Sequence, residues 1–477
     1  MKPSDLNAAS NAELKAALAN GDADFWPRLS LRSRLAGGFD DLLFLSTLRR
    51  RAEAKGLAPE GEKLRLALIG GCNLYPLHEL VGHMLSVSGY SCELFVGEFD
   101  TYVTEMLDES GALYGFRPDL VFVIPSEGRC RYEGRLTDAR ERPQAQAVEA
   151  AGRLLDLCRT FHERTRAEII LANFILPAGF DPGAYRTRTL GSDWNFRKLV
   201  NTELGLSAPR FVHVCDMEFL AYRRGALDSR DDRAWFESKQ PCAPDLLVDV
   251  AKEVAHLASS LRRAPKKVLA LDLDNTLWGG VVGDDGLEGI EVGDTSPRGE
   301  AFKAFQKYVL SLAERGVLLA VCSKNDYERA VEPFEKHPEM VLRPKDFVSF
   351  KADWNPKSDN LRAMAAELGL GLDSIVFVDD NPAEIEIVRQ FAPEVTTVLV
   401  GPDPADYVRQ LQDVRLFEPS QVTPLDSQRA EKFRREAERK VSLTSSTDMA
   451  SYLESLEMVG RLTEFNPLDA PRIAQLI

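Results

Sequence analysis

The sequence predicts an α/β protein with two doubly wound parallel-sheet domains and a helical N-terminal extension. Short apolar runs alternate with helical patterns in two successive series, as buried parallel strands separated by helices do. A basic, proline-containing segment, Arg262 to Lys267, separates the two series. The chain has 477 residues, enough for about two to four domains of ordinary size.

Residues 1–61 are expected to form the helical extension, and residues 62–262 the first α/β domain. The five strands predicted for this domain are Leu64–Ile69, Cys92–Val96, Leu120–Ile124, Ile169–Phe174 and Phe211–Cys215. A helix near Asp245–Leu261 is expected to end the domain.

Residues 263–402 are predicted to form the second α/β domain. Its predicted strands are Val268–Leu271, Val317–Cys322, Ile375–Val378 and Val395–Val400. The turn-forming residues from Gly401 to Pro404 end this domain. Residues 403–477 are expected to be a helical tail with a helix at Ser446–Gly460, and the chain stops within a helical pattern, which suggests a truncated further domain.

Composition narrows the classes of function and location. The net charge is −15, which argues against a nucleic-acid partner. Seven cysteines without CxxC pairs are typical of reduced thiols. We see no apolar secretory segment and no run approaching the roughly 18 apolar residues of a membrane span. A cytoplasmic protein without a membrane partner is therefore expected.

Two carboxylates follow the first strand of the second domain. Asp272 and Asp274 lie directly after Val268–Leu271, so they should emerge where ligands bind in open α/β sheets. One carboxylate can attack phosphorus and form an aspartyl-phosphate, and the other can protonate the leaving oxygen and then activate water. Two acids this close would repel each other unless a cation lay between them.

Further polar residues complete a predicted phosphoryl-transfer site. The predicted phosphate-binding residues are Thr276, Ser323, Lys324, Asn325 and Lys357. Asp379 and Asp380 end another strand, and hard oxygen ligands of this kind suit Mg²⁺, the predicted cofactor. A single pair of carboxylates would more often cap a helix, but all four segments together favour a site.

These four segments resemble, in order, the four motifs of the haloacid-dehalogenase superfamily. The resemblance implies that Asp272 is the nucleophile and Asp274 the acid/base. It also implies that Mg²⁺ is held by Asp272, Asp379 and a main-chain oxygen of Asp274, with Asp380 behind them. Cys322 lies inside an apolar strand and is expected to be a core residue.

A narrower resemblance is to the FkbH-like family. It rests on Leu271–Gly283, Val321–Asn325, Asp353–Lys357 and Leu372–Pro382. It implies an enzyme that dephosphorylates 1,3-bisphosphoglycerate and transfers the glyceryl group, through an enzyme thioester, to an acyl carrier protein in polyketide-type biosynthesis. Some relatives continue into an acetyltransferase-like domain, which the tail is expected to begin. The chain departs from many relatives at Ile385-Glu386, where an arginine is usual.

Two other functions remain open, a phosphatase of a small phosphorylated metabolite or protein without acyl transfer, and an inactive scaffold. The segment between Thr276 and Ser323 has room for a flap hairpin, Trp278–Gly293, and one helix. Such a small cover could admit the arm of a carrier protein. Alternatively, the first domain could supply the lid.

Cys72 is the candidate thioester residue. It follows the first strand at a turn that resembles the nucleophile turn of SGNH-type hydrolases, with Cys in place of Ser. Amides of the helix starting near Leu77 are expected to favour the thiolate. The late Asp-x-x-His pair of those hydrolases is missing, because Asp228–Trp235 contains no His. The alternative is a buried core cysteine.

Four polar residues of the first domain are weaker candidates for the same pocket. They are His78, Ser126, Asn173 and His213. Each is more often a structural residue than a functional one.

Overall fold

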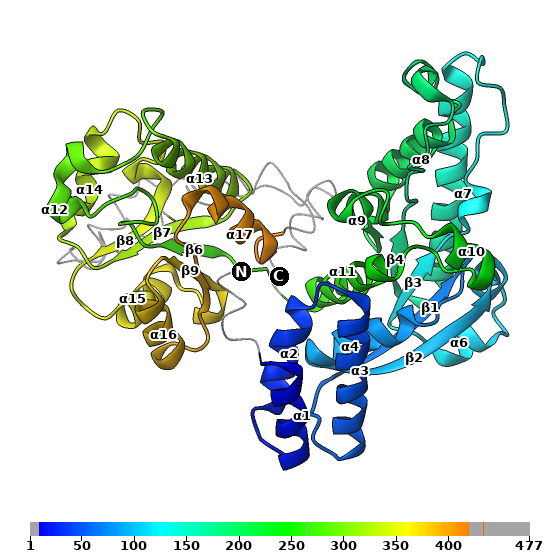
Figure 1. Cartoon of the computed structure of the whole chain (residues 1–477), viewed down its shortest axis with the longest axis horizontal. Helices are drawn as coiled ribbons and strands as arrows, with labels where there is room; N and C mark the ends of the chain where they lie inside the picture. Colours follow the sequence, from blue (N-terminus) through cyan, green and yellow to red (C-terminus); the bar gives the residue numbers. More distant parts are fainter. Residues whose placement is uncertain (1–8, 264, 419–432, 434–477) are drawn as a thin grey trace, which may run out of the picture. The chain divides into compact units, whose positions relative to one another are not determined.

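The computed structural model describes residues 9–263, 265–418 and 433. The chain divides into two compact units, Met1–Ala264 and Pro265–Ile477. Each unit is built on one five-stranded sheet (Figure 1). Within the described residues, each helix is either too short or too polar to cross a membrane.

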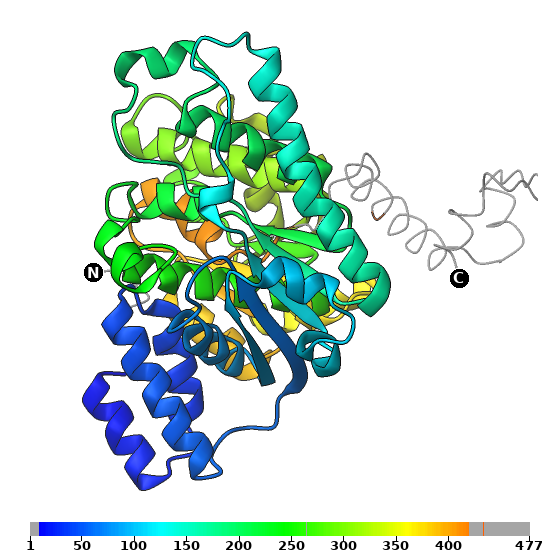
Figure 2. The ribbon, with the colours of Figure 1, turned by 90° about the vertical axis from the view of Figure 1, so that its right-hand side faces the viewer.

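Three helices precede the first sheet: α1 (Asn11–Asn20), α2 (Phe25–Leu35) and α3 (Phe39–Ala54). A capping box starts α1, since the Ser10 side chain accepts from the Glu13 amide while the Glu13 carboxylate accepts from the Ser10 amide. Figure 2 shows these helices, in blue, side by side. Their buried side chains, including Leu14 and Leu29, belong to one hydrophobic core with the sheet, so they form part of the first unit.

The first sheet contains the five predicted strands. They are β1 (Glu62–Gly70), β2 (Tyr90–Phe99), β3 (Leu120–Ile124), β4 (Glu168–Ala172) and β5 (Val212–Cys215). All neighbours are parallel, in the order β2-β1-β3-β4-β5. The strand order reverses between β1 and β3, which is where open parallel sheets bind ligands.

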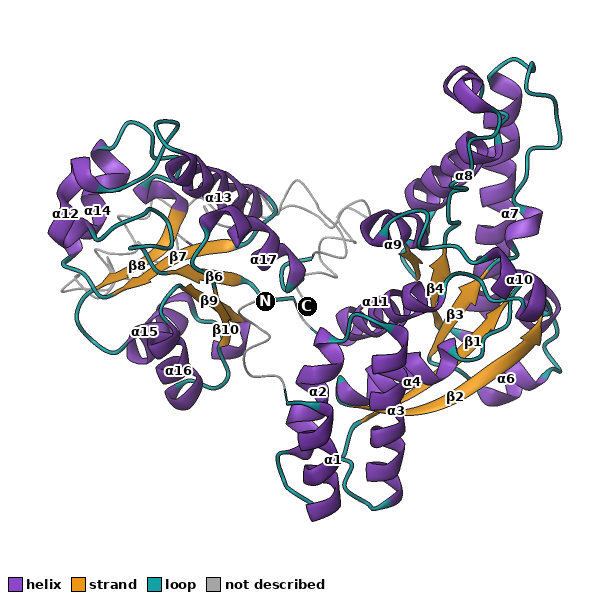
Figure 3. Ribbon diagram, in the orientation of Figure 1, coloured by secondary structure: helices purple, strands orange, loops and turns teal. Residues whose placement is uncertain are grey.

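Helices cover both faces of this sheet, because successive side chains of a strand point to opposite faces (Figure 3). Leu66 and Leu68 of β1 face a core shared with α4 (Leu77–Val87) and α11 (Pro244–Arg262). Ala67 and Ile69 face the core of α7 (Glu141–Thr165) and α8 (Asp193–Ser207). The shorter helices are α5 (Tyr102–Leu107), α6 (Ala112–Phe116), η2 (Glu127–Arg129), η3 (Gly183–Arg188), α9 (Met217–Arg224) and α10 (Asp232–Ser238).

The second sheet has one strand more than predicted. Its strands are β6 (Val268–Leu271), β7 (Leu318–Ser323), β8 (Phe347–Ala352), β9 (Ile375–Asp379) and β10 (Thr396–Leu399). They are parallel, in the order β10-β9-β6-β7-β8, so the order reverses between β6 and β9. The strand that was not predicted is β8, an edge strand whose apolar run is interrupted by Ser349 and Lys351.

Helices also cover both faces of the second sheet. One face carries α13 (Pro297–Glu314) and α17 (Tyr407–Asp413), and the other carries α15 (Lys357–Leu368) and α16 (Pro382–Phe391). The remaining helices are α12 (Val282–Gly289), α14 (Tyr327–Lys336), η4 (Pro344–Asp346), η5 (Leu372–Ser374) and η6 (Pro404–Asp406).

The core of the second unit continues beyond the predicted domain end at residue 402. The Tyr407 ring packs edge-on against Phe302 and Phe305, and its hydroxyl donates to the carbonyl of Asn275 at 2.9 Å. The turn after β10 therefore connects elements of one unit. The predicted helix at Ser446–Gly460 and the predicted truncated domain lie outside the described residues.

The predicted flap hairpin at Trp278–Gly293 was wrong. This segment contains α12, and a single antiparallel bridge joins Gly279 to Glu291. The Asp285 carboxylate accepts from the Val281 amide at 2.8 Å, which stabilises the first turn of α12. Glycines and aspartates favour turns over extended pairing, so a compact helical cover forms instead.

Candidate active site

The carboxyl ends of β6, β7 and β9 bring three predicted site residues to one edge of the second sheet. Asp272 follows β6, Ser323 ends β7 and Asp379 ends β9. The register pairs Leu271 of β6 with a residue of each neighbouring strand, so the polar residues that follow lie close together. This edge is the point at which the strand order reverses.

Lys357, at the start of α15, lies between two of these acids. Its Nζ is 3.0 Å from Oδ2 of Asp272 and 2.6 Å from Oδ2 of Asp379. All three side chains are buried. Burial lowers the pKa of Lys357, but the charges of Asp272 and Asp379 raise it by more, so the pKa lies above its ordinary value. Lys357 is therefore a permanent positive charge at this edge.

Three carboxylates here form a candidate cation site. Asp272, Asp379 and Asp380 each offer one oxygen, all within 4.8 Å of one another. Oδ1 of Asp272 is buried and has no hydrogen-bond partner among the described residues. Burial and the charge of Asp272 raise the pKa of Asp379 to about 7, although Lys357 lowers it. One lysine does not balance three acids, so a hard divalent cation fits this donor set.

The Asp274 carboxylate lies outside that cluster and is held by other groups. Its Oδ1 accepts from Trp278 Nε1 and from the Val282 amide, both at 3.0 Å. Its Oδ2 accepts from Nδ2 of Asn325 at 2.9 Å. Burial raises the pKa of Asp274, and the charge of Asp272 raises it further. A carboxyl group with a raised pKa suits a general acid. The main-chain oxygen of Asp274 remains a predicted metal ligand.

The predicted phosphate-binding residues differ in their contacts. Ser323 is buried at the carboxyl end of β7, next to the edge where Asp272 and Asp379 lie. The Thr276 hydroxyl donates to Oδ1 of Asp380 at 3.5 Å. Asn325 is engaged by Asp274, and Nζ of Lys324 pairs with Oε1 of Glu384 at 2.6 Å. Ser323 and Lys357 remain predicted phosphate-binding residues.

Two residues that contact this site, Trp278 and Glu384, were not predicted from the sequence. Trp278 is fully buried, and a buried indole N–H needs an acceptor, so the Asp274 carboxylate four residues earlier was a usable signal. Glu384 lies in the first turn of α16, where acidic residues are common because the helix dipole favours negative charge near the N-terminus. Only the tertiary contact with Lys324 distinguishes it.

Cys72 lies in the hydrophobic core of the first unit and is 4% exposed. Burial, and then the charge of Asp100, raise the pKa of its thiol to about 12. The predicted thiolate was therefore wrong, because desolvation outweighs any effect of the following helix. The preceding Gly71 must be a glycine, since a Cβ there would overlap Ser126, whose hydroxyl donates to Asp100.

The other candidates of the first unit have structural partners. Nδ1 of His78 lies 3.2 Å from the Leu74 carbonyl, and Nε2 of His213 lies 2.8 Å from Oε2 of Glu168. Nδ2 of Asn173 donates to Oδ1 of Asp216 at 2.8 Å. These contacts account for the three residues without any role for Cys72.

Fold and site together define the class of this protein: an α/β protein with a buried carboxylate–lysine site at the carboxyl edge of its second parallel sheet. No family model matches the chain, and no curated protein sequence matches it. Among solved structures, it is similar to the N-terminal part of the protein BF1531 from Bacteroides fragilis, which contains a phosphatase domain and is complexed with Mg. The two are 31% identical, with a TM-score of 0.66, over 76% of this chain and 95% of that one.

The chain belongs to the family of this BF1531 phosphatase-domain protein. A match over 76% of the chain is longer than either compact unit, so it includes residues of both. A second similar structure is a cobalamin-binding protein from Desulfitobacterium hafniense DCB-2, with 17% identity over 42% of this chain and 94% of that one. Its TM-score of 0.23 is too low to inform fold or function.

Proposed function

We propose that this protein is a Mg²⁺-dependent phosphatase whose active site lies at the β6–β9 edge. The observation that carries the proposal is the buried triad of Asp272, Lys357 and Asp379, in which Oδ1 of Asp272 has no partner among the described residues. The Mg complex of the BF1531 phosphatase domain supports the choice of metal. Asp272, Asp379 and Asp380 would hold the ion, which would neutralise charge on the phosphoryl oxygens.

In the proposed hydrolysis of a phosphate ester, Asp272 is the nucleophile and Asp274 is the general acid and base. An Asp272 oxygen attacks phosphorus, the bond to the leaving oxygen breaks, and Asp274 gives that oxygen its proton. Asp274 then takes a proton from water as the water attacks the aspartyl-phosphate, which releases phosphate and restores Asp272. Lys357 and the Ser323 hydroxyl bind the phosphoryl oxygens throughout both steps.

Replacing the nucleophile tests this proposal. Asp272→Asn keeps the shape of the side chain but removes the attacking charge, so Mg²⁺-dependent hydrolysis of p-nitrophenyl phosphate should fall by about 1,000-fold or more. Asp359→Asn, at a side chain that is 60% exposed and paired with Arg362, is the matched control and should keep its rate. Full activity of Asp272→Asn would contradict the assignment.

The narrower proposal is that the substrate is 1,3-bisphosphoglycerate and that the glyceryl group passes through Cys72 to an acyl carrier protein in polyketide-type biosynthesis. Its support is the resemblance of Leu271–Gly283 and the three other segments to the FkbH-like family. In this step the Cys72 sulfur attacks the acyl carbon, the bond from that carbon to its phosphate oxygen breaks, and this phosphate leaves with the thiol proton. The second phosphate, an ester at the other end of the molecule, is removed by hydrolysis through the Asp272 aspartyl-phosphate, which leaves a glyceryl group on the sulfur. The thiol must lose its proton during the attack, because burial keeps it neutral beforehand.

Intact-mass spectrometry separates transfer from simple hydrolysis. Incubation with Mg²⁺ and 1,3-bisphosphoglycerate should add a glyceryl-sized mass that is lost in Cys72→Ala and kept in Cys158→Ala, a control at another buried cysteine. A thiol-bearing carrier protein should then remove the adduct. Phosphate release without any adduct would favour the phosphatase without acyl transfer.

A further inference from the structure

The first unit contains a pocket of its own beyond the carboxyl ends of its strands. Its volume is about 160 Å³, and its lining includes Glu127, Arg197, Arg230, Trp235, Gln240 and Cys242. Glu127 begins η2, three residues after the end of β3, and the strand order reverses between β3 and β1. Ligands of open parallel sheets bind outside the carboxyl ends at such a reversal.

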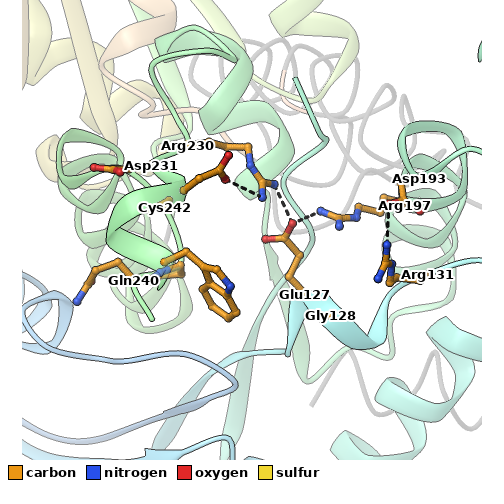
Figure 4. A pocket seen from close by; sticks show the side chains of 12 residues that line it. Glu127, Gly128, Arg131, Asp193, Arg197, Arg230, Asp231, Gln240 and Cys242 are labelled. Carbon is orange, nitrogen blue, oxygen red and sulfur yellow. Dashed lines mark hydrogen bonds and ion pairs between the residues drawn. The ribbon is translucent and has the colours of Figure 1, made fainter. Parts of the chain in front are cut away.

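Two arginines of this pocket share one carboxylate. Figure 4 shows Arg197 and Arg230 approaching Glu127 from opposite sides. Nη1 of Arg230 lies 2.7 Å from Oε1 of Glu127, and Nη1 of Arg197 donates to the same oxygen. Burial raises the pKa of Glu127, but the two arginines lower it by more, so Glu127 is ionised. Two positive charges thus face one negative charge.

The other acids of the lining are closer to solvent. The Asp193 and Asp232 side chains are 44% and 79% exposed, and their nearest arginine nitrogens are 3.8 and 3.9 Å away. Asp231 caps α10 by accepting from the Ala234 amide at 3.0 Å. Water screens such exposed charges, so the least screened charges of the pocket are Glu127 and the two arginines that meet it.

Two buried polar atoms in this lining have no partner in the described part of the chain. They are Nε of Arg197 and Oε1 of Gln240. Arg197 is only 6% exposed, and its Nη1 is already used by Glu127 and by the Ile175 carbonyl at 3.1 Å. Buried polar groups are normally hydrogen-bonded, so a free donor and a free acceptor in one pocket point to a ligand that completes them.

We infer that this pocket binds a small organic anion that carries a hydroxyl group. Its acidic oxygens would lie on Arg197 and Arg230, its hydroxyl would donate to Gln240, and its carbon atoms would pack near Trp235. Arginine is suited to carboxylates and phosphates because its donors match two oxygens at once. All of its lining residues belong to the first unit, whereas the residues of the proposed phosphatase site belong to the second.

Fluorine NMR of the full chain labelled with 5-fluorotryptophan tests this inference locally. The chain has five tryptophans, and Trp235→Phe identifies the resonance of the residue in the pocket. Lactate and glycerol phosphate, in EDTA and at constant ionic strength, serve as carboxylate and phosphate probes. At least one should shift the Trp235 resonance saturably, and the tighter probe identifies the preferred acidic group.

Arg230→Gln should weaken that binding by about tenfold, the effect of losing one hydrogen bond to a charged group. Arg153→Gln, at an exposed arginine paired with Glu149, is the matched control and should bind as the unmodified protein does. The four other resonances report whether a variant is folded. The inference would be overturned if neither probe shifted the Trp235 resonance, or if Arg230→Gln left the affinity of the probe unchanged. It would also be overturned if neutral propane-1,2-diol shifted the resonance equally.

Discussion

Nζ of Lys357 lies 2.6 Å from Oδ2 of Asp379, and the two side chains are 3% and 0% exposed. A pair buried this deeply is stable only if charge and hydrogen bonding remain balanced. Here the balance involves a second carboxylate, Asp272, at 3.0 Å from the same nitrogen. The lysine therefore contributes to the stability of the second unit.

Lys357→Met keeps most of the side-chain volume and removes the charge. Without Mg²⁺, the buried acids lose their counter-ion, and the free energy of unfolding should fall by about 3–5 kcal/mol in urea titrations. Mg²⁺ should restore more stability to this variant than to the unmodified protein. Lys336→Met, at a lysine that is 62% exposed and paired with Glu332, should change the stability little, because water screens an exposed ion pair. Equal losses in the two variants would contradict this account of Lys357.

Trp278 is predicted to be a positioning residue that acts through Asp274. Trp278→Phe removes the 3.0 Å hydrogen bond from Nε1 to the Asp274 carboxylate. The kcat for phosphate esters with poor leaving groups should fall by about tenfold, since Asp274 is then less well oriented for proton transfer. The KM should change little, and p-nitrophenyl phosphate, whose leaving group needs no proton, should be less affected. Trp194→Phe, in the first unit, is the control, and an equal loss for both kinds of ester would refute the positioning role.

The pairing of Lys324 with Glu384 can be separated from a role in phosphate binding. Lys324→Met leaves the largely buried Glu384 carboxylate without its partner, so stability should fall, and adding Glu384→Gln should recover part of the loss. A double-mutant cycle should give a coupling energy of about 1 kcal/mol. If KM rises in Lys324→Met and no coupling is found, Lys324 binds the substrate phosphate instead.

The stability of the first unit should decrease in acid because of His83. This residue of α4 is fully buried, its Nε2 lies 2.8 Å from the Ser33 hydroxyl, and burial, followed by Arg49, lowers its pKa to about 3. Below pH 6.5 the unfolded chain binds a proton that the folded unit cannot accept. The contribution of His83 to the free energy of unfolding is therefore fully present above pH 6.5. It falls by up to about 1.4 kcal/mol per pH unit between pH 6.5 and 3.

Hydrogen exchange of peptides from α4 at pH 7, 6 and 5, corrected for intrinsic exchange rates, measures this dependence. The His83→Gln variant should show a shallower decrease in stability, whatever its absolute stability. Equal slopes in the two proteins would show that another group controls the acid sensitivity of this unit.

Much of the fold could be predicted from the sequence because local patterns carry it. All five strands of the first sheet and four of the second appear as apolar runs, and parallel strands buried on both faces require such runs. Edge strand β8 does not, since Ser349 and Lys351 break its run, and only pairing with β7 defines it as a strand. The structure of the Trp278–Gly293 segment could not be predicted from the sequence either, because α12 is held by contacts such as the one between the Val282 amide and the Asp274 carboxylate.

Four site residues could be chosen from the sequence: Asp272, Asp274, Asp379 and Lys357. Each lies close to the end of a strand or at the start of a helix, and parallel strands end at a common edge. Chain order does not reveal which side chains meet. The tertiary structure alone decided that Asn325 holds Asp274, that Lys324 pairs with Glu384, and that Cys72 is a neutral thiol. The physical reason is that burial and charge–charge distances, which set ion pairing and pKa values, arise from packing between segments far apart in the chain.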